Sequence, residues 1–309
     1  MTRQTLLLLA ALAVLIAVPF FATESYTRHL FILAFLYAII ASNWDLSLGH
    51  AGLFNFGHMT FFAMGVYTAA ILAKAVELTP WLAIPIGGVT AAAAAFVVAA
   101  PVARLKGIYV VLITFAFSQV VLQLILSQSD LTGGAGGMVR IPPLEWGEYR
   151  FHRDQRFGYF YIALGLLVVS TVFLLWLRAS PFGKSLIALR DSEEYALARG
   201  IPVTRNRVLA LVLSSIFPGI AGGFFAIYLR VASPEVLSFS TLSLALSMVL
   251  VGGAGTIVGP IIAAFAIIFA TEALAGFRGM EEARFIVVAI SMILVLRFFP
   301  GGLAQLIRR

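Results

Sequence analysis

The stretch that decides how this chain is interpreted is RASPFGKSLIALRDSEEYALARGIPVTRNR, residues 178–207. It holds nine charged side chains, in a 309-residue chain with only 21 Lys and Arg and 14 Asp and Glu. The sequence on both sides of it is almost continuously apolar. We therefore expect this stretch to lie outside a membrane and to join two groups of membrane-spanning helices.

Within this stretch the sequence predicts two short helices. Ser180 is placed to cap the first helix, with Pro181 at its opening position. Asp191 and Glu194 form a D-x-x-E capping pattern for the second helix, which Gly200 can end. A helix, turn and helix that project from a bundle suit mechanical coupling to a partner in the cytoplasm. The alternative is a solvated loop whose amphipathic helix lies on anionic lipid.

The composition is that of an integral membrane protein. Apolar residues make up 61% of the chain and charged residues 11%, with a mean hydropathy of +1.01, whereas about a quarter of a soluble domain is charged. The net charge of +7 is spread over many short loops without a basic stripe, so it favours positive-inside topology over nucleic-acid binding. The absence of cysteine excludes disulfides and thiolate metal sites.

Hydropathy predicts an all-α, polytopic membrane helix bundle of about ten segments, with shorter segments where a helix is broken. The segments run near 6–22, 29–48, 58–76, 81–103, 107–127, 158–178, 208–229, 239–254, 257–277 and 285–299. The first segment resembles a signal peptide, but Phe20-Phe21-Ala22 is a poor cleavage pattern, so we interpret it as a retained span. With both ends in the cytoplasm, the inside loops hold twelve Lys and Arg and the outside loops nine. Eight spans with two re-entrant segments are the alternative.

Two glycine-rich stretches interrupt the apolar segments. They are GHAGLFNFG, residues 49–57, and GGAGTIVG, residues 252–259, about 200 residues apart at corresponding places in two halves of the chain. Paired interruptions predict inverted repeats and a translocation path, because unpaired backbone groups are tolerated at membrane depth only beside protein or water. The alternative is close helix packing through small residues.

We expect the path to pass between these two stretches. Its predicted residues are Asn43, Asp45, Gly52, Asn55, Gly57, Thr114, Gly253 and Gly255. The glycines would let backbone approach solute or partner helices, and the other four residues would supply polar groups. Asp45 is ionisable at membrane depth, which indicates function by default. It is placed to meet a substrate ammonium, to hold the broken helix, or to cap or snorkel near the interface.

The sequence contains no readable catalytic arrangement. Gly183-Lys184-Ser185 resembles the end of a phosphate-binding loop, but Arg178 stands where the first glycine is required, so we expect no ATP to bind here. The four histidines, which lack metal-ligand spacing, are His29, His50, His58 and His152. We find no Ser-His-Asp arrangement and no facing carboxylates, so the sequence predicts neither an enzyme nor a bound cofactor.

Several ordered blocks give the chain a family resemblance. They are 48–58, 61–69, 107–114, 132–134, 180–183, Arg190 with Glu193, Ala196 and Gly200, 221–222, 233–235, 252–255 and 299–303. In this order and spacing they resemble the LivM-type permease subunits of branched-chain (hydrophobic) amino acid ABC importers. The resemblance covers most of the chain.

The resemblance implies one transmembrane permease domain over residues 1–309, with two inverted halves of five helices each, in the plasma (inner) membrane of a bacterium. Besides membrane lipid, it implies as partners a LivH-like second permease subunit, two cytoplasmic ATP-binding subunits and an extracytoplasmic solute-binding protein. Residues 178–207 fall where the cytoplasmic coupling loop to the ATPases belongs.

In such importers the coupling loop carries the signature E-A-A-x-x-x-G. Glu194-Tyr195-Ala196 and Gly200 match it, with Tyr195 in place of an alanine, while the later apolar-proline part is not clear. The predicted ATPase contacts are Arg190, Glu193, Glu194, Ala196 and Gly200. A second departure is Gln119, where several relatives carry a glutamate.

Three functions fit these features. The first is an importer permease for branched-chain or related hydrophobic amino acids, which moves solute by alternating access with ATP bound in partner subunits. The second is the same machine for urea, amides or aromatic acids, because the scaffold blocks do not read the ligand. The third is an ion-coupled secondary transporter with inverted repeats. The charged loop between the halves favours the first two.

Overall fold

The computed structural model describes residues 3–21, 24–147, 149–151, 156–275 and 302. Its α-helices are α1 (Arg3–Phe21), α2 (Ser25–Asp45), α3 (His58–Lys74), α4 (Pro80–Val102), α5 (Ile108–Ser127), α6 (Ser129–Thr132), α7 (Phe157–Ala179), α8 (Pro181–Asp191), α9 (Glu193–Ala198), α10 (Val203–Leu229), α11 (Phe239–Gly252) and α12 (Val258–Ala275). Between them lie the π-helical turn η1 (Leu46–His50), the 3-10 turns η2 (Gly134–Gly136) and η3 (Pro234–Leu237), and the strands β1 (Met138–Val139), β2 (Glu145–Trp146), β3 (Tyr149–Arg150) and β4 (Val231–Ala232). The strands pair antiparallel, β1 with β4 and β2 with β3.

Helices occupy nine of the ten predicted membrane segments, and the tenth, residues 285–299, lies outside the described residues. Within the described part of the chain, five helices are long and apolar enough to cross a membrane: α2 with η1, α4, α5, α7 and α10. Shorter apolar helices lie in α1, α11 and α12. The protein is therefore an all-α, polytopic membrane bundle.

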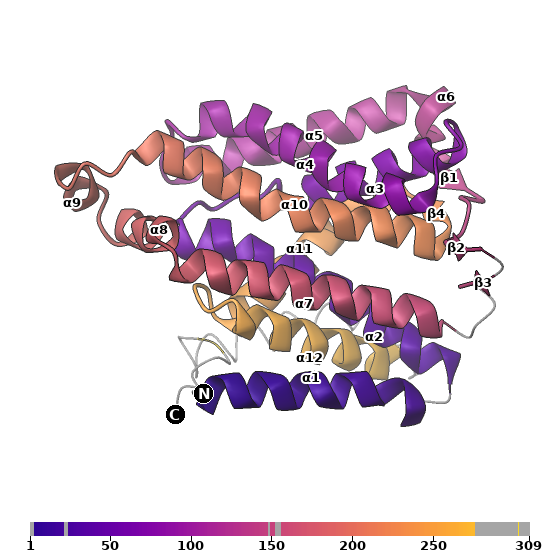
Figure 1. Cartoon of the computed structure of the whole chain (residues 1–309). Coiled ribbons are helices and arrows are strands. Elements are labelled where there is room, and N and C mark those ends of the chain that lie inside the picture. The colour runs from indigo at the N-terminus through magenta and orange to yellow at the C-terminus, as the bar shows by residue number, and fades with distance from the viewer. Residues whose placement is uncertain (1–2, 22–23, 148, 152–155, 276–301, 303–309) are drawn as a thin grey trace.

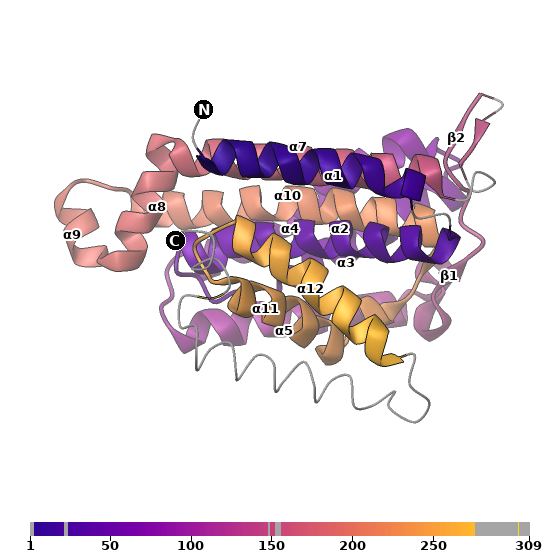
Figure 2. The same cartoon turned by 90° about the horizontal axis from the view of Figure 1, so that it is seen from below.

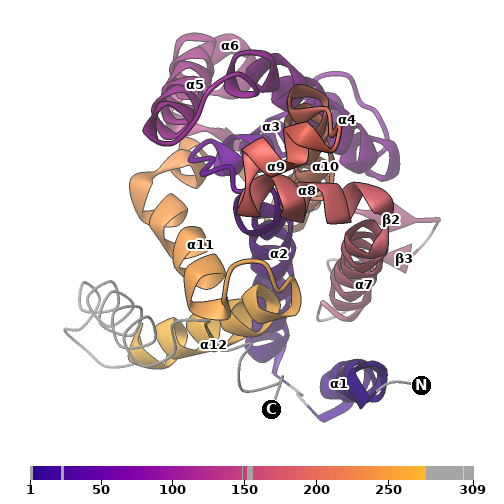
Figure 3. The same ribbon diagram turned by 90° about the vertical axis from the view of Figure 1, so that its left-hand side faces the viewer.

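Helix α2 runs through the middle of the bundle (Figure 3). It contacts α7, α10, α11 and α12, and every residue from Ala38 to Asp45 is buried. A helix that is apolar on all sides is expected to be enclosed by other helices. Helix α1, in contrast, lies along the outside of the bundle (Figure 2).

Glycines determine how closely α3 and α10 approach each other. A Cβ atom on Gly65 of α3 would overlap the Gly219 carbonyl of α10, and one on Gly222 would overlap the Phe62 carbonyl. In a membrane, helices associate through such close packing because lipid offers apolar contacts of its own. The glycines therefore join the two parts of the chain that lie before and after residues 178–207.

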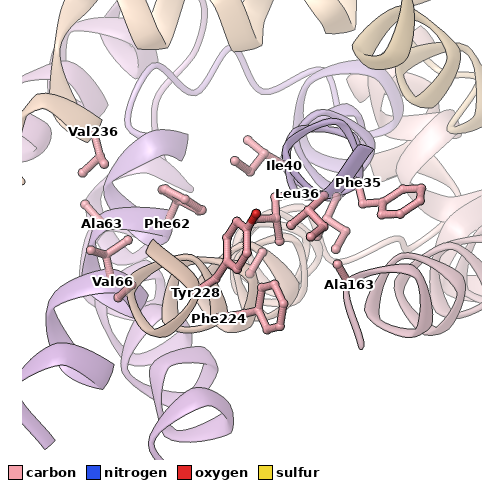
Figure 4. Packing of buried hydrophobic residues seen from close by; sticks show 14 of the residues in the cluster. Phe35, Leu36, Ile40, Phe62, Ala63, Val66, Ala163, Phe224, Tyr228 and Val236 are labelled. Atoms are coloured by element: carbon pink, nitrogen blue, oxygen red, sulfur yellow. The ribbon is translucent and has the colours of Figure 1, made fainter. Parts of the chain in front are cut away.

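Large apolar side chains fill the space between α2, α3, α7 and α10 (Figure 4). Phe35 of α2 packs edge-on against Phe160 of α7, with ring centroids 5.1 Å apart. Tyr228 of α10 lies between Leu36 of α2 and Phe62 of α3 (Figure 4). This core positions α2 and α3, which flank the first glycine-rich stretch.

The two ends of the bundle differ (Figure 1). At the coupling end, residues 180–202, α8 and α9 project beyond the other helices; at the strand end, residues 128–151 and 230–238, lie the short strands. Lys74 Nζ ties α3 to the strand end by donating to the Val139 carbonyl at 2.9 Å. Helix α1 begins towards the coupling end (Figure 1), as the predicted topology requires.

Candidate functional site

Helix α8, which begins the projecting unit, starts as the sequence predicts. The Ser180 Oγ accepts a hydrogen bond from the Gly183 N–H at 3.2 Å, and Pro181 opens the helix. Proline suits this position because its missing N–H would have no helical partner there. The short helix is thereby defined by local chemistry.

Helix α9 starts one residue later than the capping pattern predicts. Ser192, not Asp191, caps it, through an Oγ that accepts from the Tyr195 N–H at 3.3 Å. The prediction for Asp191 is wrong because this residue ends α8 and binds Arg190 with its carboxylate. Gly200 follows the helix with φ +76°, the left-handed conformation that glycine favours after a helix end.

The surface of α9 consists of both apolar and charged groups. Tyr195 is 57% exposed and Leu197 55% exposed, and Glu194 and Gly200 are exposed beside them. Ala196 is fully buried, so its methyl group packs inside the subunit. The large exposed apolar side chains of α9 therefore belong to the two neighbours of Ala196.

Glu193 ties α9 to the bundle. Its Oε2 lies 3.0 Å from both Lys106 Nζ and the Arg207 guanidinium, which come from the loop before α5 and from α10. Burial by itself would raise the pKa of the Glu193 carboxyl, but the two cations hold that pKa below its ordinary value. Glu193 therefore remains charged at neutral pH and holds three elements together.

Arg190, whose side chain is 37% exposed, reaches from the end of α8 to the first glycine-rich stretch. One guanidinium nitrogen donates to the Gly49 carbonyl at 2.6 Å, while Nε and the other terminal nitrogen donate to Asp191 Oδ1 at 2.9 and 2.8 Å. Gly52 packs on the same side chain, because a Cβ there would lie 3.1 Å from Arg190 Cγ. Arg190 thus connects the projecting unit to the first glycine-rich stretch.

A cavity of about 240 Å³ lies beside this contact. Its lining residues are 51–54, 105–107, 110, 189–193 and 207. The lining includes three cations and two carboxylates, so it is polar although it adjoins membrane helices. Both the projecting unit and the first glycine-rich stretch therefore border this polar cavity.

We define the first glycine segment as residues 46–57, which are the first glycine-rich stretch (residues 49–57) together with the start of η1. This segment prolongs α2 as a π-helical turn and then leaves the helix. The Ala51 N–H donates to the Leu46 carbonyl at 3.1 Å, and Gly52 has φ +68°. Gly49 has no space for a side chain, because a Cβ there would overlap Asp45 Oδ1 and the Gly255 nitrogen. Single π-helical turns are frequent at functional sites.

The second glycine segment, residues 252–259, joins α11 to α12. Gly253, Gly255 and Ile257 all have positive φ, at +98°, +85° and +60°. Gly252 lies against the backbone of residues 259–260, so the segment folds back sharply on itself. Gly302 also belongs here, because a Cβ on it would overlap the backbone of Gly253.

Asp45 joins the two glycine segments. Its side chain is fully buried, and its two oxygens accept from the Gly255 N–H at 2.6 Å and the Ile257 N–H at 3.0 Å. His50 Nδ1 lies 3.5 Å from Asp45 Oδ2. An acidic side chain is favourable here because these N–H groups precede the N-terminus of α12. In this structure Asp45 holds the second broken segment rather than facing an open space.

The other predicted polar residues form two separate groups. Asn55 Oδ1 accepts from the Gly57 N–H at 2.8 Å, and Thr114 Oγ1 accepts from the Phe56 N–H at 3.0 Å, so α5 contacts the first glycine segment. Asn43 Nδ2 instead donates to the Ser170 hydroxyl on α7 at 2.7 Å. The structure therefore brings Asp45 together with Gly253 and Gly255, brings Asn55, Gly57 and Thr114 together, and keeps Asn43 apart.

Sequence reasoning included Asn55 but missed Trp44 and Thr60, which lie beside the first glycine segment. The buried atoms Trp44 Nε1, Asn55 Nδ2 and Thr60 Oγ1 have no hydrogen-bond partner among the described residues. The His58 ring stacks on Trp44 with centroids 5.3 Å apart. The sequence signal for these groups is the high density of polar residues around the helix break. That density does not indicate which of the polar side chains are buried without a hydrogen-bond partner.

The described residues bring no three His, Asp or Glu side chains together as metal ligands. His152, one of the four histidines considered, lies outside the described residues. The polar groups found are instead those of a broken-helix junction and a projecting helical unit. This arrangement is typical of a membrane protein that changes conformation.

Comparisons with known proteins identify the family of this chain. A family model described as the branched-chain amino acid transport system permease component matches residues 26–296. The high-affinity branched-chain amino acid transport system permease protein LivM of Escherichia coli is 30% identical over 327 residues, covering 99% of this chain and 76% of the relative. The corresponding LivH protein of Salmonella typhimurium is 25% identical over 285 residues, covering 86% of this chain and 90% of the relative. No solved structure matches.

The matched family is one of transport permeases and not of enzymes. Its model covers most of the chain, including both glycine segments and the projecting unit. The chain therefore belongs to the family of LivM-like permease components of branched-chain amino acid ABC transport systems.

Proposed function

We propose that this chain is one of the two permease subunits of an ABC importer that moves branched-chain or related hydrophobic amino acids across the bacterial plasma (inner) membrane. The observation that carries the proposal is the projecting α8–α9 unit, because Arg190 connects it to the glycine junction inside the bundle. Work done on this unit by a partner can thereby reach the membrane interior. Energy comes from ATP hydrolysis in partner subunits.

The proposed complex has four kinds of component. A LivH-like permease pairs with this chain, two ATP-binding subunits bind at the coupling end, and an extracytoplasmic solute-binding protein delivers solute at the strand end. The similarity to relatives named LivM and LivH supports a pair of related permeases. Membrane lipid surrounds the remaining apolar surface.

The proposed topology is a single permease domain over residues 1–309, with about ten segments in two inverted halves and both termini in the cytoplasm. Helices at nine predicted segments support the segment count. The projection of α8 and α9 from the end at which α1 begins supports a cytoplasmic coupling loop at 178–207 (Figure 1).

ATPase docking is proposed to involve the exposed surface of α9, with Glu194, Tyr195, Leu197 and Gly200 facing the partner. Ala196 supports this surface from inside, since its methyl group is buried. Of the other predicted docking residues, Glu193 anchors the helix and Arg190 binds the first glycine segment. An aromatic and an aliphatic side chain within a charged rim are a common composition for a docking surface.

The solute path is proposed to run beside the first glycine segment, past Asn43, Asp45, Gly52, Asn55, Gly57 and Thr114, with Gly253 and Gly255 on the other side of the Asp45 junction. Buried polar atoms that find no partner in the described part of the chain support this placement, because each costs about 1–3 kcal/mol unless water or solute pairs with it in another state. Gly52 borders the polar cavity at the coupling end, where solute would leave.

Reconstitution with the other subunits tests the function. We expect ATP-dependent uptake of labelled leucine into proteoliposomes, with no ATP hydrolysis by this chain alone. ATP-dependent uptake of labelled urea, of an amide or of an aromatic acid, without uptake of leucine, would support the same machine for another solute. Uptake driven by an ion gradient without the ATPases would contradict the proposal in favour of a secondary transporter.

A further inference from the structure

The last turn of α8 meets the end of the broken helix α2–η1 through Arg190. Its guanidinium donates to the Gly49 carbonyl at 2.6 Å. Carbonyl groups at the end of a helix lack helical partners and carry the negative end of the helix dipole, so a cation binds there favourably. The bond is therefore charge-assisted, which makes it stronger than an ordinary hydrogen bond.

The same side chain also borders the second glycine segment. A Cβ atom on Gly255 would lie 3.0 Å from the Arg190 nitrogen that binds Gly49, and 3.2 Å from the Gly49 carbonyl oxygen. Asp45 in turn accepts a hydrogen bond from the Gly255 N–H. One guanidinium thus contacts the place where both broken segments meet, 141 residues from Gly49 in the sequence.

Asp191 fixes the direction of the guanidinium. Its Oδ1 accepts from both Nε and a terminal nitrogen, which leaves the other terminal nitrogen for Gly49. The carboxylate is itself 59% exposed, so it belongs to the projecting unit and not to the membrane interior. A shift of α8 would therefore move the guanidinium relative to Gly49.

We propose that Arg190 is the positioning residue that transmits movement of the α8–α9 unit to the junction of the two glycine segments, instead of contacting the ATPase. This inference rests on the proposed importer function. It goes further by assigning one hydrogen bond, Arg190 to Gly49, as the mechanical link. Loss of this bond uncouples ATP hydrolysis from transport without separating the subunits.

The test compares Arg190→Ala, Arg190→Lys and the matched control Lys184→Ala, which removes an exposed cation from the same helix. Each complete complex is reconstituted, and ATP hydrolysis and leucine uptake are measured on the same vesicles. Phe54→Cys adds a reporter at an exposed position of the first glycine segment in this cysteine-free chain. Its reaction with a water-soluble maleimide is compared with and without ATP.

We expect Arg190→Ala to keep the ATPases bound and ATP hydrolysis within about twofold, while uptake falls about tenfold or more, as loss of one charge-assisted hydrogen bond allows. The Phe54→Cys reaction rate no longer responds to ATP. Arg190→Lys, which keeps a charged donor, gives an intermediate ratio of uptake to hydrolysis, and Lys184→Ala matches the wild type.

Parallel loss of hydrolysis and uptake, or dissociation of the ATPases, in Arg190→Ala would overturn the proposal and return Arg190 to the docking surface. Unchanged uptake would overturn it as well. If the alanine variant of this chain does not fold into the membrane, Arg190→Lys decides, and a wild-type ratio of uptake to hydrolysis then contradicts the proposal. The cysteine reporter needs ATP and no particular solute, so it separates this inference from a wrong choice of substrate.

Discussion

The two glycine segments have similar compositions but different structures. The first, residues 46–57, continues a helix through a π-helical turn and has one residue with positive φ, Gly52. The second, residues 252–259, is a sharp turn with three such residues, and Asp45 binds two of its N–H groups. Similar sequence patterns thus give two different structures: a buried carboxylate holds the second segment, and none among the described residues holds the first in this way.

This structural difference suggests different roles for the two segments: the second as an anchor and the first as a candidate moving part. Around the first segment, Trp44 Nε1 and Asn55 Nδ2 are buried without partners among the described residues, and a polar cavity adjoins it. The second segment is packed against the backbone on both sides. We infer that conformational change acts mainly on the first segment, with the second as the fixed support.

The largest effect is expected from removing the bond between the segments. Asp45→Ala leaves the Gly255 and Ile257 N–H groups buried and unpaired, which costs about 3 kcal/mol or more. Asp45→Asn keeps one acceptor oxygen, so its loss of folding stability should be roughly half as large. Thermal unfolding of the detergent-purified complex measures both. A wild-type melting temperature in the alanine variant would show that Asp45 does not anchor the second segment.

The next largest effect is expected from filling the contact between the segments. Gly49→Ala places a methyl group against Asp45 and the Gly255 nitrogen, and such overpacking costs about 1–3 kcal/mol. Gly165→Ala on α7 is the control, because nothing lies within 4 Å of its Cβ position and alanine favours a helix by about 1 kcal/mol. The same unfolding assay, together with uptake, should separate them. Equal behaviour of the two variants would contradict the close contact.

Thiol accessibility sharpens the comparison between the two segments. Single cysteines at 52, 55 and 253, with one at 43 on α2, test each segment in turn. In this conformation we expect only position 52 to react rapidly, since it is exposed and the other three are buried. ATP plus binding protein should raise the rate at 55 more than at 253. A cysteine at 145, exposed at the strand end, is the positive control.

If position 253 instead responds as strongly as position 55, both segments move and the anchor interpretation is wrong. If all four positions stay unreactive in every state while position 145 reacts, the segments are packing sites and the solute path lies elsewhere. Either result follows from reaction rates alone, without knowing the solute.

The smallest effect is expected at Glu193, which borders the cavity next to the first segment. Its folded pKa lies below the ordinary value of 4.5, so its ion pairs stabilise the fold above that pH and lose this contribution as the pH falls through the folded pKa. Glu193→Gln should therefore lower stability by less than about 1 kcal/mol at pH 7. At strongly acidic pH the two proteins should unfold at the same temperature; a persistent difference would indicate lost packing and not lost charge.

The sequence predicted what depends on local chemistry. Local residues determine the apolar segments of membrane length, the cap at Ser180 and the turn at Gly200. The capping error at Asp191 arose because two adjacent residues can both cap, and the contact with Arg190 engages one of them. The resemblance to a permease family also came from ordered motifs in the sequence, and the family match agrees with it.

The candidate site was predicted only in part, because its contacts join residues far apart in the chain. Asp45 was recognised as unusual, but its partners lie 210 and 212 residues away. Ala196 matches the coupling signature, yet which side of α9 is buried depends on how that helix sits on the bundle.

By itself, the sequence determined that this protein is a polytopic membrane bundle with a charged loop and two glycine breaks, because hydropathy and turn chemistry are properties of short segments. Only the tertiary structure decided that Arg190 binds the first glycine segment and that Asp45 binds the second. The physical reason is that a buried polar group must find a partner in space. The packing of η1 against α8, and of α2 against α12, determines which partner is within reach.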